Sequence, residues 1–328
     1  MKPRVVFTDP HQHVFEQELL ALLENLGATY EARRCQTDQE VIDLCQDADA
    51  IMTSQAVLSR TAIESFEKCR HIARVGTGYD NIDHVAAGEH GITVTNVPAF
   101  CTDEVASHAV LLGLACDRKL VYLDQQLRQG HWRQFDLCES SERLDGRLFG
   151  VVGFGAIGQA AARRAAAFGM RILFYDPFFG ESPADLTAEK CDSLQALLEQ
   201  ADFVSLHTAL TAESRHLIGP QEFQQMKSTA ILIKTARGPV VDQDALITAL
   251  KTGQIAAAGL DVFNPEPVPQ ECPLLKMDNG VLSPHTAAHT RGSLAELRQR
   301  TVEEVMRILQ GEPPLHVVNT PWLKSASS

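Results

Sequence analysis

Three polar residues in the C-terminal half of the chain have the chemistry to act together on a small anionic carbonyl compound. Arg237, Glu266 and His285 each lie within a few residues of an apolar run typical of a buried strand. An arginine can hold a carboxylate and polarise a carbonyl, and an imidazole can donate a proton near neutral pH. A carboxylate beside the imidazole keeps it charged.

The position of the three runs matters more than any one residue. Singly, each side chain has an ordinary interpretation as a surface or loop group. The carboxyl ends of parallel strands, however, meet in one crevice at the edge of a sheet, so we expect the three side chains to converge there. The runs are 230–233, 256–260 and 280–282.

A glycine-rich turn upstream is typical of a dinucleotide site. Gly153, Gly155 and Gly158 are spaced as G-x-G-x-x-G between an apolar run and a helix-forming stretch. The first glycine permits the tight turn, the second lets the backbone approach a pyrophosphate, and the third lets the helix pack on the strand. Free N–H groups at the helix start then face the phosphates.

Asp176 strengthens this interpretation. It ends the next apolar run and lies 18 residues beyond Gly158, near the spacing expected of an acidic residue that binds the adenosine ribose. Its charge would repel a 2′-phosphate, so we expect NAD (NADH) rather than NADP. The alternative is a turn without a ligand, with Asp176 as an ordinary residue before Pro177.

The strand and helix signals predict an α/β protein with two Rossmann-like domains, each with a doubly wound parallel sheet. Long helices are expected over 15–26, from Thr102 or Asp103 to about Gln129, and over 292–310; the last can cross back to the first domain. The expected strands are 5–8, 50–53, 72–75 and 92–95, then 148–152, 171–175, 202–206, 229–234, 256–260 and 280–282.

Composition limits the possible partners and compartment. A chain of 328 residues with 45% hydrophobic residues is expected to form two domains, and a net charge of −13 argues against nucleic acid or an anionic membrane. Eight scattered cysteines and an N-terminus without a signal-like apolar segment favour a cytoplasmic location. Asp9, His11 and His13 resemble metal ligands, but a solvated loop is the better interpretation, and we expect no metal.

The chain resembles the D-isomer-specific 2-hydroxyacid dehydrogenase family over nearly its whole length. The resemblance implies a discontinuous substrate domain (1–100 plus 291–328), an NAD-binding domain (101–290), an active site in the cleft between them, and a homodimer built on the NAD-binding domains. It is carried by seven segments: 76–83, 96–98, 153–158, 206–207, 235–238, 261–263 and 284–287.

The resemblance also implies roles for individual residues. Arg237, Glu266 and His285 take the catalytic positions, and the N–H groups of Thr77 and Gly78, with Arg237, bind the substrate carboxylate. Asp261 takes the position that contacts the nicotinamide carboxamide. The implied cofactor-binding residues are Thr102, Gly153, Gly155, Ala156, Ile157, Gly158, Asp176, His207, Thr235, Ala236, Arg237, Asp261, His285 and Ala287.

The predicted function is therefore hydride transfer between nicotinamide and a small D-2-hydroxy or 2-oxo acid. The chain departs from the family pattern at Ser107, Ala209 and Ala288. Ala288 and the following His289 leave the identity of the substrate open, and Arg237 could also hold a phospho-substrate such as 3-phosphoglycerate. A second alternative is an NAD(H)-sensing protein similar to the C-terminal-binding corepressors, which Phe174-Tyr175-Asp176-Pro177 resembles.

Overall fold

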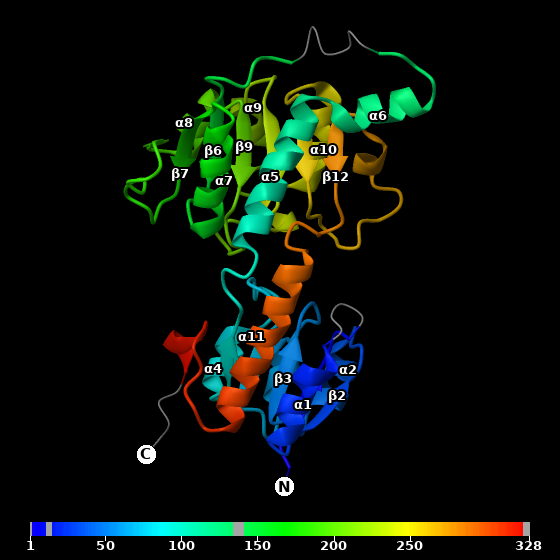
Figure 1. The fold of residues 1–328 in the computed structure, drawn as a ribbon, viewed down its shortest axis with the longest axis vertical. Helices are drawn as coiled ribbons and strands as arrows, with labels where there is room; N and C mark the ends of the chain where they lie inside the picture. The colour runs from blue at the N-terminus through cyan, green and yellow to red at the C-terminus, as the bar shows by residue number, and fades with distance from the viewer. Residues whose placement is uncertain (1, 11–14, 134–140, 324–328) are drawn as a thin grey trace. The chain divides into compact units, whose positions relative to one another are not determined.

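The computed structural model describes residues 2–10, 15–133 and 141–323, which divide into two compact units. One unit comprises Met1–Phe100 with Thr290–Ser328, and the other comprises Cys101–His289. Each unit is built on a parallel sheet of its own (Figure 1). The fold is therefore the predicted α/β class with two parallel-sheet domains.

The first unit has a five-stranded sheet in the order β2-β1-β3-β4-β5. Its strands are β1 (Arg4–Phe7), β2 (Thr29–Ala32), β3 (Ala50–Thr53), β4 (His71–Arg74) and β5 (Thr93–Thr95). Helices α2 (Asp38–Cys45), α3 (Arg60–Glu64) and α4 (His84–Glu89) bury apolar side chains against this sheet. Helices α1 (Gln17–Asn25) and α11 (Arg291–Leu309) contact each other, and the unit ends in a short turn of helix, η3 (Thr320–Trp322).

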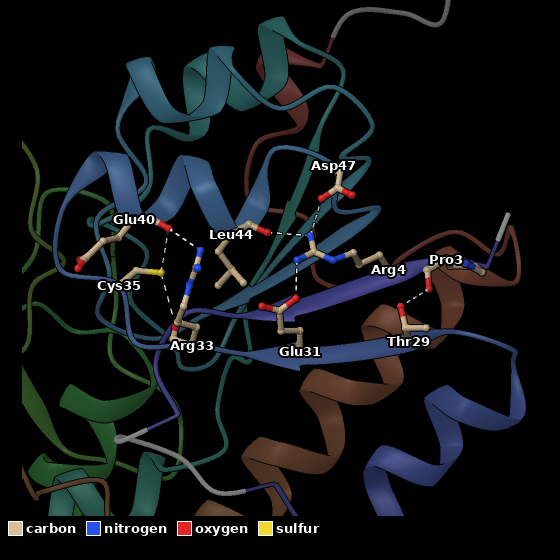
Figure 2. A network of polar contacts seen from close by, with 9 residues as sticks. All are labelled: Pro3, Arg4, Thr29, Glu31, Arg33, Cys35, Glu40, Leu44 and Asp47. Carbon is tan, nitrogen blue, oxygen red and sulfur yellow. Dashed lines mark hydrogen bonds and ion pairs between the residues drawn. The ribbon is translucent and has the colours of Figure 1, made fainter.

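Strand β2 is a structural element that the sequence pattern does not predict. It is a mostly exposed edge strand, so it lacks the apolar signature of the others. Arg4 on β1 fastens it by an ion pair of 2.7 Å to Glu31, and holds Asp47 at 2.6 Å and the carbonyl oxygen of Leu44 at 2.8 Å (Figure 2). The edge is thus held by polar contacts instead of apolar burial.

The second unit has a seven-stranded sheet in the order β12-β11-β10-β9-β6-β7-β8. Its strands are β6 (Leu148–Val152), β7 (Arg171–Tyr175), β8 (Ala188–Lys190), β9 (Phe203–Leu206), β10 (Ile231–Lys234), β11 (Ala257–Leu260) and β12 (Gly280–Leu282). The short, polar edge strand β8 is another element absent from the sequence prediction. All strand pairs of this seven-stranded sheet are parallel, so the carboxyl ends of the strands share one edge of the sheet.

Helices cover both faces of this sheet. Helices α5 (Thr102–Asp117) and α7 (Ala156–Ala167) contact each other on one face (Figure 1) and bury alanine and leucine side chains against the sheet. Helices α8 (Leu194–Gln200), α9 (Pro220–Gln225) and α10 (Gln243–Thr252) contribute to the other core. Two short helical turns, η1 (Gly238–Val240) and η2 (Pro273–Lys276), complete the unit.

The single helix predicted from Thr102 to about Gln129 is wrong. The chain forms α5 and then a separate helix, α6 (Leu120–Arg128), because Lys119 between them adopts a φ of +46°. The two segments also differ in environment: α5 is largely buried, whereas every residue of α6, all of them described, is at least partly exposed. Apolar periodicity alone cannot report a left-handed residue between two helical segments.

Candidate active site

The glycine turn lies where the order of the strands in the second sheet reverses. From β6 the chain continues outward to β7 and β8, and then returns to place β9 on the other side of β6. Such a switch point leaves a crevice at the strand ends, where ligands bind. Gly153 has a φ of +90°, and a Cβ there would come within 2.8 Å of the His207 backbone beyond β9.

The turn has the shape needed to hold a pyrophosphate. A Cβ on Gly158 would lie 2.1 Å from the Gly153 carbonyl oxygen, so the third glycine lets α7 approach the strand. At Gly155, which precedes α7, a Cβ would meet no atom of the described chain within 4 Å. The second glycine therefore opens onto space beside a helix start, as a phosphate site requires.

Two hydroxyl groups nearby fit a further polar ligand. The Oγ1 atoms of Thr208 and Thr235 are buried and have no hydrogen-bond partner within the described ranges. Thr208 lies beside the glycine turn, because its backbone nitrogen would be 2.9 Å from a Cβ on Gly153. Buried hydroxyls of this kind are costly unless a ligand or water satisfies them. The site therefore fits a dinucleotide.

Asp176 is held at the edge of this crevice. Its Oδ2 accepts a hydrogen bond of 2.7 Å from the Phe154 N–H of the glycine turn, and its Oδ1 accepts one of 2.8 Å from Phe178. A carboxylate has about four acceptor positions, so capacity for two hydroxyl groups remains. Asp176 is thus both a turn residue and a candidate ribose ligand.

Glu266 and His285 form a hydrogen-bonded pair. The distance between Nδ1 of His285 and Oε2 of Glu266 is 2.7 Å, and Oε1 of Glu266 accepts the Phe263 N–H at 2.7 Å. Burial alone raises the pKa of Glu266, but the His285 bond and charge, the Phe263 N–H and the charge of Arg237 outweigh it and lower this pKa below its usual value. The carboxylate is therefore ionised at neutral pH.

A close backbone approach brings the arginine loop against the glutamate loop. Gly238 follows Arg237, and a Cβ on Gly238 would lie only 1.7 Å from the Phe263 carbonyl oxygen. Any larger residue would separate the two loops. This glycine, which sequence reasoning did not single out, lets the Arg237 segment and the Glu266 segment pack directly together.

Asp261 fixes the loop that carries His285. This fully buried carboxylate accepts the N–H groups of Thr286 and Ala287, both at 2.9 Å, and the Ser283 hydroxyl at 2.6 Å. His285 itself has a φ of +54°, which a non-glycine residue adopts only when its surroundings enforce it. The Asp261 contacts supply that constraint.

Two further residues of this network were missed by sequence reasoning. Nε2 of His108 on α5 lies 2.8 Å from Oγ of Ser283, which in turn donates to Asp261. The resemblance implies that Asp261 contacts the cofactor; within the chain, its hydrogen bonds support the loop that carries His285. A histidine inside an apolar helix, nine residues before the end of α5, was the available signal for His108.

The remaining predicted residues are distributed between the two units. His207 follows β9 and lies 2.8 Å from the Ser205 hydroxyl; burial lowers its pKa to about 4, so its ring is neutral at pH 7. Thr102 is the first residue of α5, and Ala236 accepts a hydrogen bond of 2.9 Å from the Arg237 guanidinium. Thr77 and Gly78 belong to the first unit, where the Thr77 hydroxyl donates to Val97 at 3.0 Å.

The metal-like signal near the N-terminus has a structural explanation at Asp9. The interpretation of Asp9 as part of a solvated loop is wrong, because its side chain is buried and accepts the N–H groups of Ser54 at 2.7 Å and Ala56 at 2.9 Å. His11 and His13 lie outside the described residues.

The fold and the glycine turn define a dinucleotide-binding protein, and comparison with known proteins specifies the family. The family model for the NAD-binding domain of D-isomer-specific 2-hydroxyacid dehydrogenases matches residues 110–287. A glyoxylate reductase of Korarchaeum cryptofilum is 38% identical over 99% of this chain and 98% of that protein. A D-3-phosphoglycerate dehydrogenase of Methanocaldococcus jannaschii is 37% identical over 97% of this chain but 60% of that protein.

Comparison with a solved structure supports the same family. The NADPH-dependent glyoxylate/hydroxypyruvate reductase of Sinorhizobium meliloti, in complex with NADP and malonate, has a TM-score of 0.84 and 29% identity, covering 99% of this chain and all of that one. The chain belongs to the D-isomer-specific 2-hydroxyacid dehydrogenase family. It is an oxidoreductase of hydroxy acids that uses a nicotinamide cofactor, which confirms the predicted reaction class.

Proposed function

We propose that this enzyme reduces a small 2-oxo acid to the D-2-hydroxy acid with NADH, and that Arg237, Glu266 and His285 perform the chemistry. The observation that carries the proposal is the 2.7 Å contact between Nδ1 of His285 and Glu266. It fixes the ring and commits Nδ1 to the carboxylate, which leaves Nε2 to exchange a proton with substrate.

Each residue has one task in this mechanism. Arg237 holds the substrate carboxylate through its planar fork of donors and polarises the adjacent carbonyl. His285 donates its Nε2 proton to the carbonyl oxygen as negative charge develops there, and Glu266 stabilises the imidazolium beforehand. When bound, the nicotinamide supplies the hydride that adds to the carbonyl carbon. In the reverse direction His285 accepts the hydroxyl proton.

We assign the cofactor to the second unit and a second carboxylate contact to the first. The glycine turn, Thr208, Thr235 and Asp176 would hold the dinucleotide, and Asp176 favours NAD over NADP by repelling a 2′-phosphate. In the first unit, the N–H groups of Thr77 and Gly78 would bind the substrate carboxylate. The Asn96 side chain supports this loop by donating to the Thr77 carbonyl oxygen at 2.6 Å.

Substrate choice is tested by NADH oxidation with purified protein over a panel of 2-oxo acids. Because some relatives are named glyoxylate reductase or glyoxylate/hydroxypyruvate reductase, glyoxylate and hydroxypyruvate are the first candidate substrates for this chain. The phosphoglycerate dehydrogenase relative supports a second candidate, and 3-phosphohydroxypyruvate belongs in the same panel. Tight NADH binding without turnover of any compound would reject the proposal. Efficient turnover of the phosphorylated compound alone would favour the second candidate.

We further propose a cytoplasmic homodimer assembled through the second unit. Helix α6 exposes Leu120, Val121 and Leu127, and α5 exposes Leu111, so both helices offer apolar side chains that a second copy could cover. Sedimentation should give a dimer, and Leu127→Glu should convert it to a monomer; a monomeric unmodified protein would reject this part. None of the seven described cysteines forms a disulfide, which is consistent with a reducing cytoplasm. Within the described ranges, no helix combines the length and apolar character that crossing a membrane requires.

A further inference from the structure

A fully buried lysine, Lys234, lies at the end of the strand that leads into the Arg237 loop. Lys234 is the last residue of β10, pairs in register with Leu206 on β9 and Leu260 on β11, and has no exposed surface. Lysine is rarely buried without a partner, because removing an ammonium group from water is costly. Its position at the end of an apolar strand in the middle of the sheet therefore requires an explanation.

Its contacts lead to the loops of both Arg237 and Glu266. Nζ of Lys234 donates a hydrogen bond of 3.3 Å to the carbonyl oxygen of Gly238, the residue after Arg237. Gly238 packs directly on the Phe263 carbonyl, and the Phe263 N–H donates to Glu266. Lys234 thus anchors the segment on which the Arg237 and Glu266 loops meet.

Several ionisable groups lie on the elements packed around the end of β10. They are Asp103, Glu104, His108 and Asp117 on α5, His207 after β9, Arg237 after β10, Asp261 and Glu266 after β11, and His285 and His289 after β12. Burial lowers the pKa of Lys234 to about 8, and the Glu266 carboxylate is the charge that opposes this effect. Lys234 is therefore largely an ammonium ion at pH 7, electrostatically coupled to Glu266.

We propose that Lys234 is a positioning residue for hydride transfer: it anchors the Arg237 loop through Gly238, and its charge tempers the influence of Glu266 on His285. This inference rests on the proposed function of the three residues. The Glu266 carboxylate stabilises the imidazolium, and a cation beneath it offsets part of that stabilisation.

The direct test is Lys234→Met, which keeps most of the length of the side chain and removes its charge and its hydrogen-bond donor. We expect the high-pH limb of the profile for 2-oxo acid reduction to move upward by about half a pH unit or more, because Glu266 acts on His285 without opposition. The KM for the 2-oxo acid should rise about fivefold, as expected for the loss of one hydrogen bond that holds the Arg237 loop. The matched control is Lys251→Met, at an exposed position of α10, which should change neither quantity.

A second measurement does not depend on turnover. The titration of the His285 ring, followed by NMR in the unmodified protein and in Lys234→Met, should show the same upward displacement. In a Glu266→Gln background, Lys234→Met should displace it less, because Lys234 then lacks the carboxylate that raises its own pKa and carries less positive charge. Reduced activity with an unmoved titration would overturn the proposal, as would an equal displacement in both backgrounds. Failure of the proposed function would instead appear as no turnover by the unmodified protein.

Discussion

Nδ1 of His285 lies 2.7 Å from Oε2 of Glu266, and the histidine holds this position with a backbone φ of +54°. The side chain of Asp261 stabilises this unusual backbone conformation, because it accepts hydrogen bonds from the N–H groups of Thr286 and Ala287, the two residues after His285. The His285–Asp261 backbone contact, N–H to carbonyl oxygen at 2.7 Å, adds to this support. The ring is therefore aimed by the loop and by the glutamate together.

Removal of the Glu266 charge should move the pH dependence of catalysis in a defined direction. In the proposed mechanism, reduction requires the protonated imidazole, so activity should fall as the pH rises and the proton is lost. In Glu266→Gln the imidazolium loses its anionic partner, and the high-pH limb should move to lower pH with a fall in kcat of roughly 10²-fold or less. The measurement is kcat and kcat/KM for 2-oxo acid reduction across pH 5 to 10.

Glu271→Gln is the matched control for this prediction, because Glu271 lies exposed in the chain segment that follows. It should leave the profile unchanged. A Glu266→Gln profile that coincides with that of the unmodified protein would show that the observed pair does not set the charge of His285.

The contact between Gly238 and Phe263 predicts a sharp steric requirement. In Gly238→Ala the new Cβ would lie 1.7 Å from the Phe263 carbonyl oxygen, so the Arg237 and Glu266 loops must separate. We expect kcat/KM to fall by about 10²-fold or more, since a displacement of about 1 Å in a catalytic site has an effect of that size. Cofactor affinity, measured by fluorescence titration with NADH, should change much less.

Gly180→Ala provides the control, because a Cβ at Gly180 meets nothing within 4 Å in the described chain and its φ is not positive. It should retain full activity. If Gly238→Ala were equally active, the two loops would have more freedom to move apart than their packing indicates.

The sequence predicts those parts of the site that depend on regular strand ends. Arg237, Glu266 and His285 were identified because apolar runs mark buried strands, and parallel strands must end at one edge. Lys234 and Gly238 were missed because their roles depend on which loops touch, and that is set by tertiary packing. The same reason explains β2 and β8, whose polar edge positions carry no apolar signal. The left-handed Lys119 between α5 and α6 likewise has no pattern in the sequence.

Asp176 is predicted to decide between the two nicotinamide dinucleotides. In Asp176→Asn the negative charge near the adenosine ribose is lost, and one amide group must face either the Phe154 or the Phe178 N–H. NADH affinity should fall by about tenfold, which corresponds to roughly 1.4 kcal/mol, whereas NADPH affinity should rise or stay the same. Dissociation constants for both cofactors measure this directly. Parallel losses for NADH and NADPH would mean that Asp176 acts through the turn and not through its charge.

His71 is predicted to make the stability of the first unit sensitive to acid. Its ring is fully buried, Nε2 lies 2.9 Å from the Thr95 hydroxyl, and Nδ1 has no hydrogen-bond partner in the described part of the chain. Burial lowers the pKa of His71 to about 3, whereas an unfolded histidine has a pKa of about 6.5. Between these values the unfolded chain binds a proton that the folded chain excludes.

The stabilising effect is therefore complete above about pH 6.5 and is lost as the pH falls toward 3. Between pH 7.5 and pH 5 this one group should lower the free energy of unfolding by about 2 kcal/mol, at about 1.4 kcal/mol per pH unit below 6.5. His71→Gln can keep a bond to Thr95 but cannot titrate, so its loss over the same interval, measured by urea unfolding, should be smaller by that amount. An identical pH dependence in both proteins would show that His71 binds its proton equally well in the folded and unfolded chain. Solvent would then reach the ring in spite of the packing of β4 and β5.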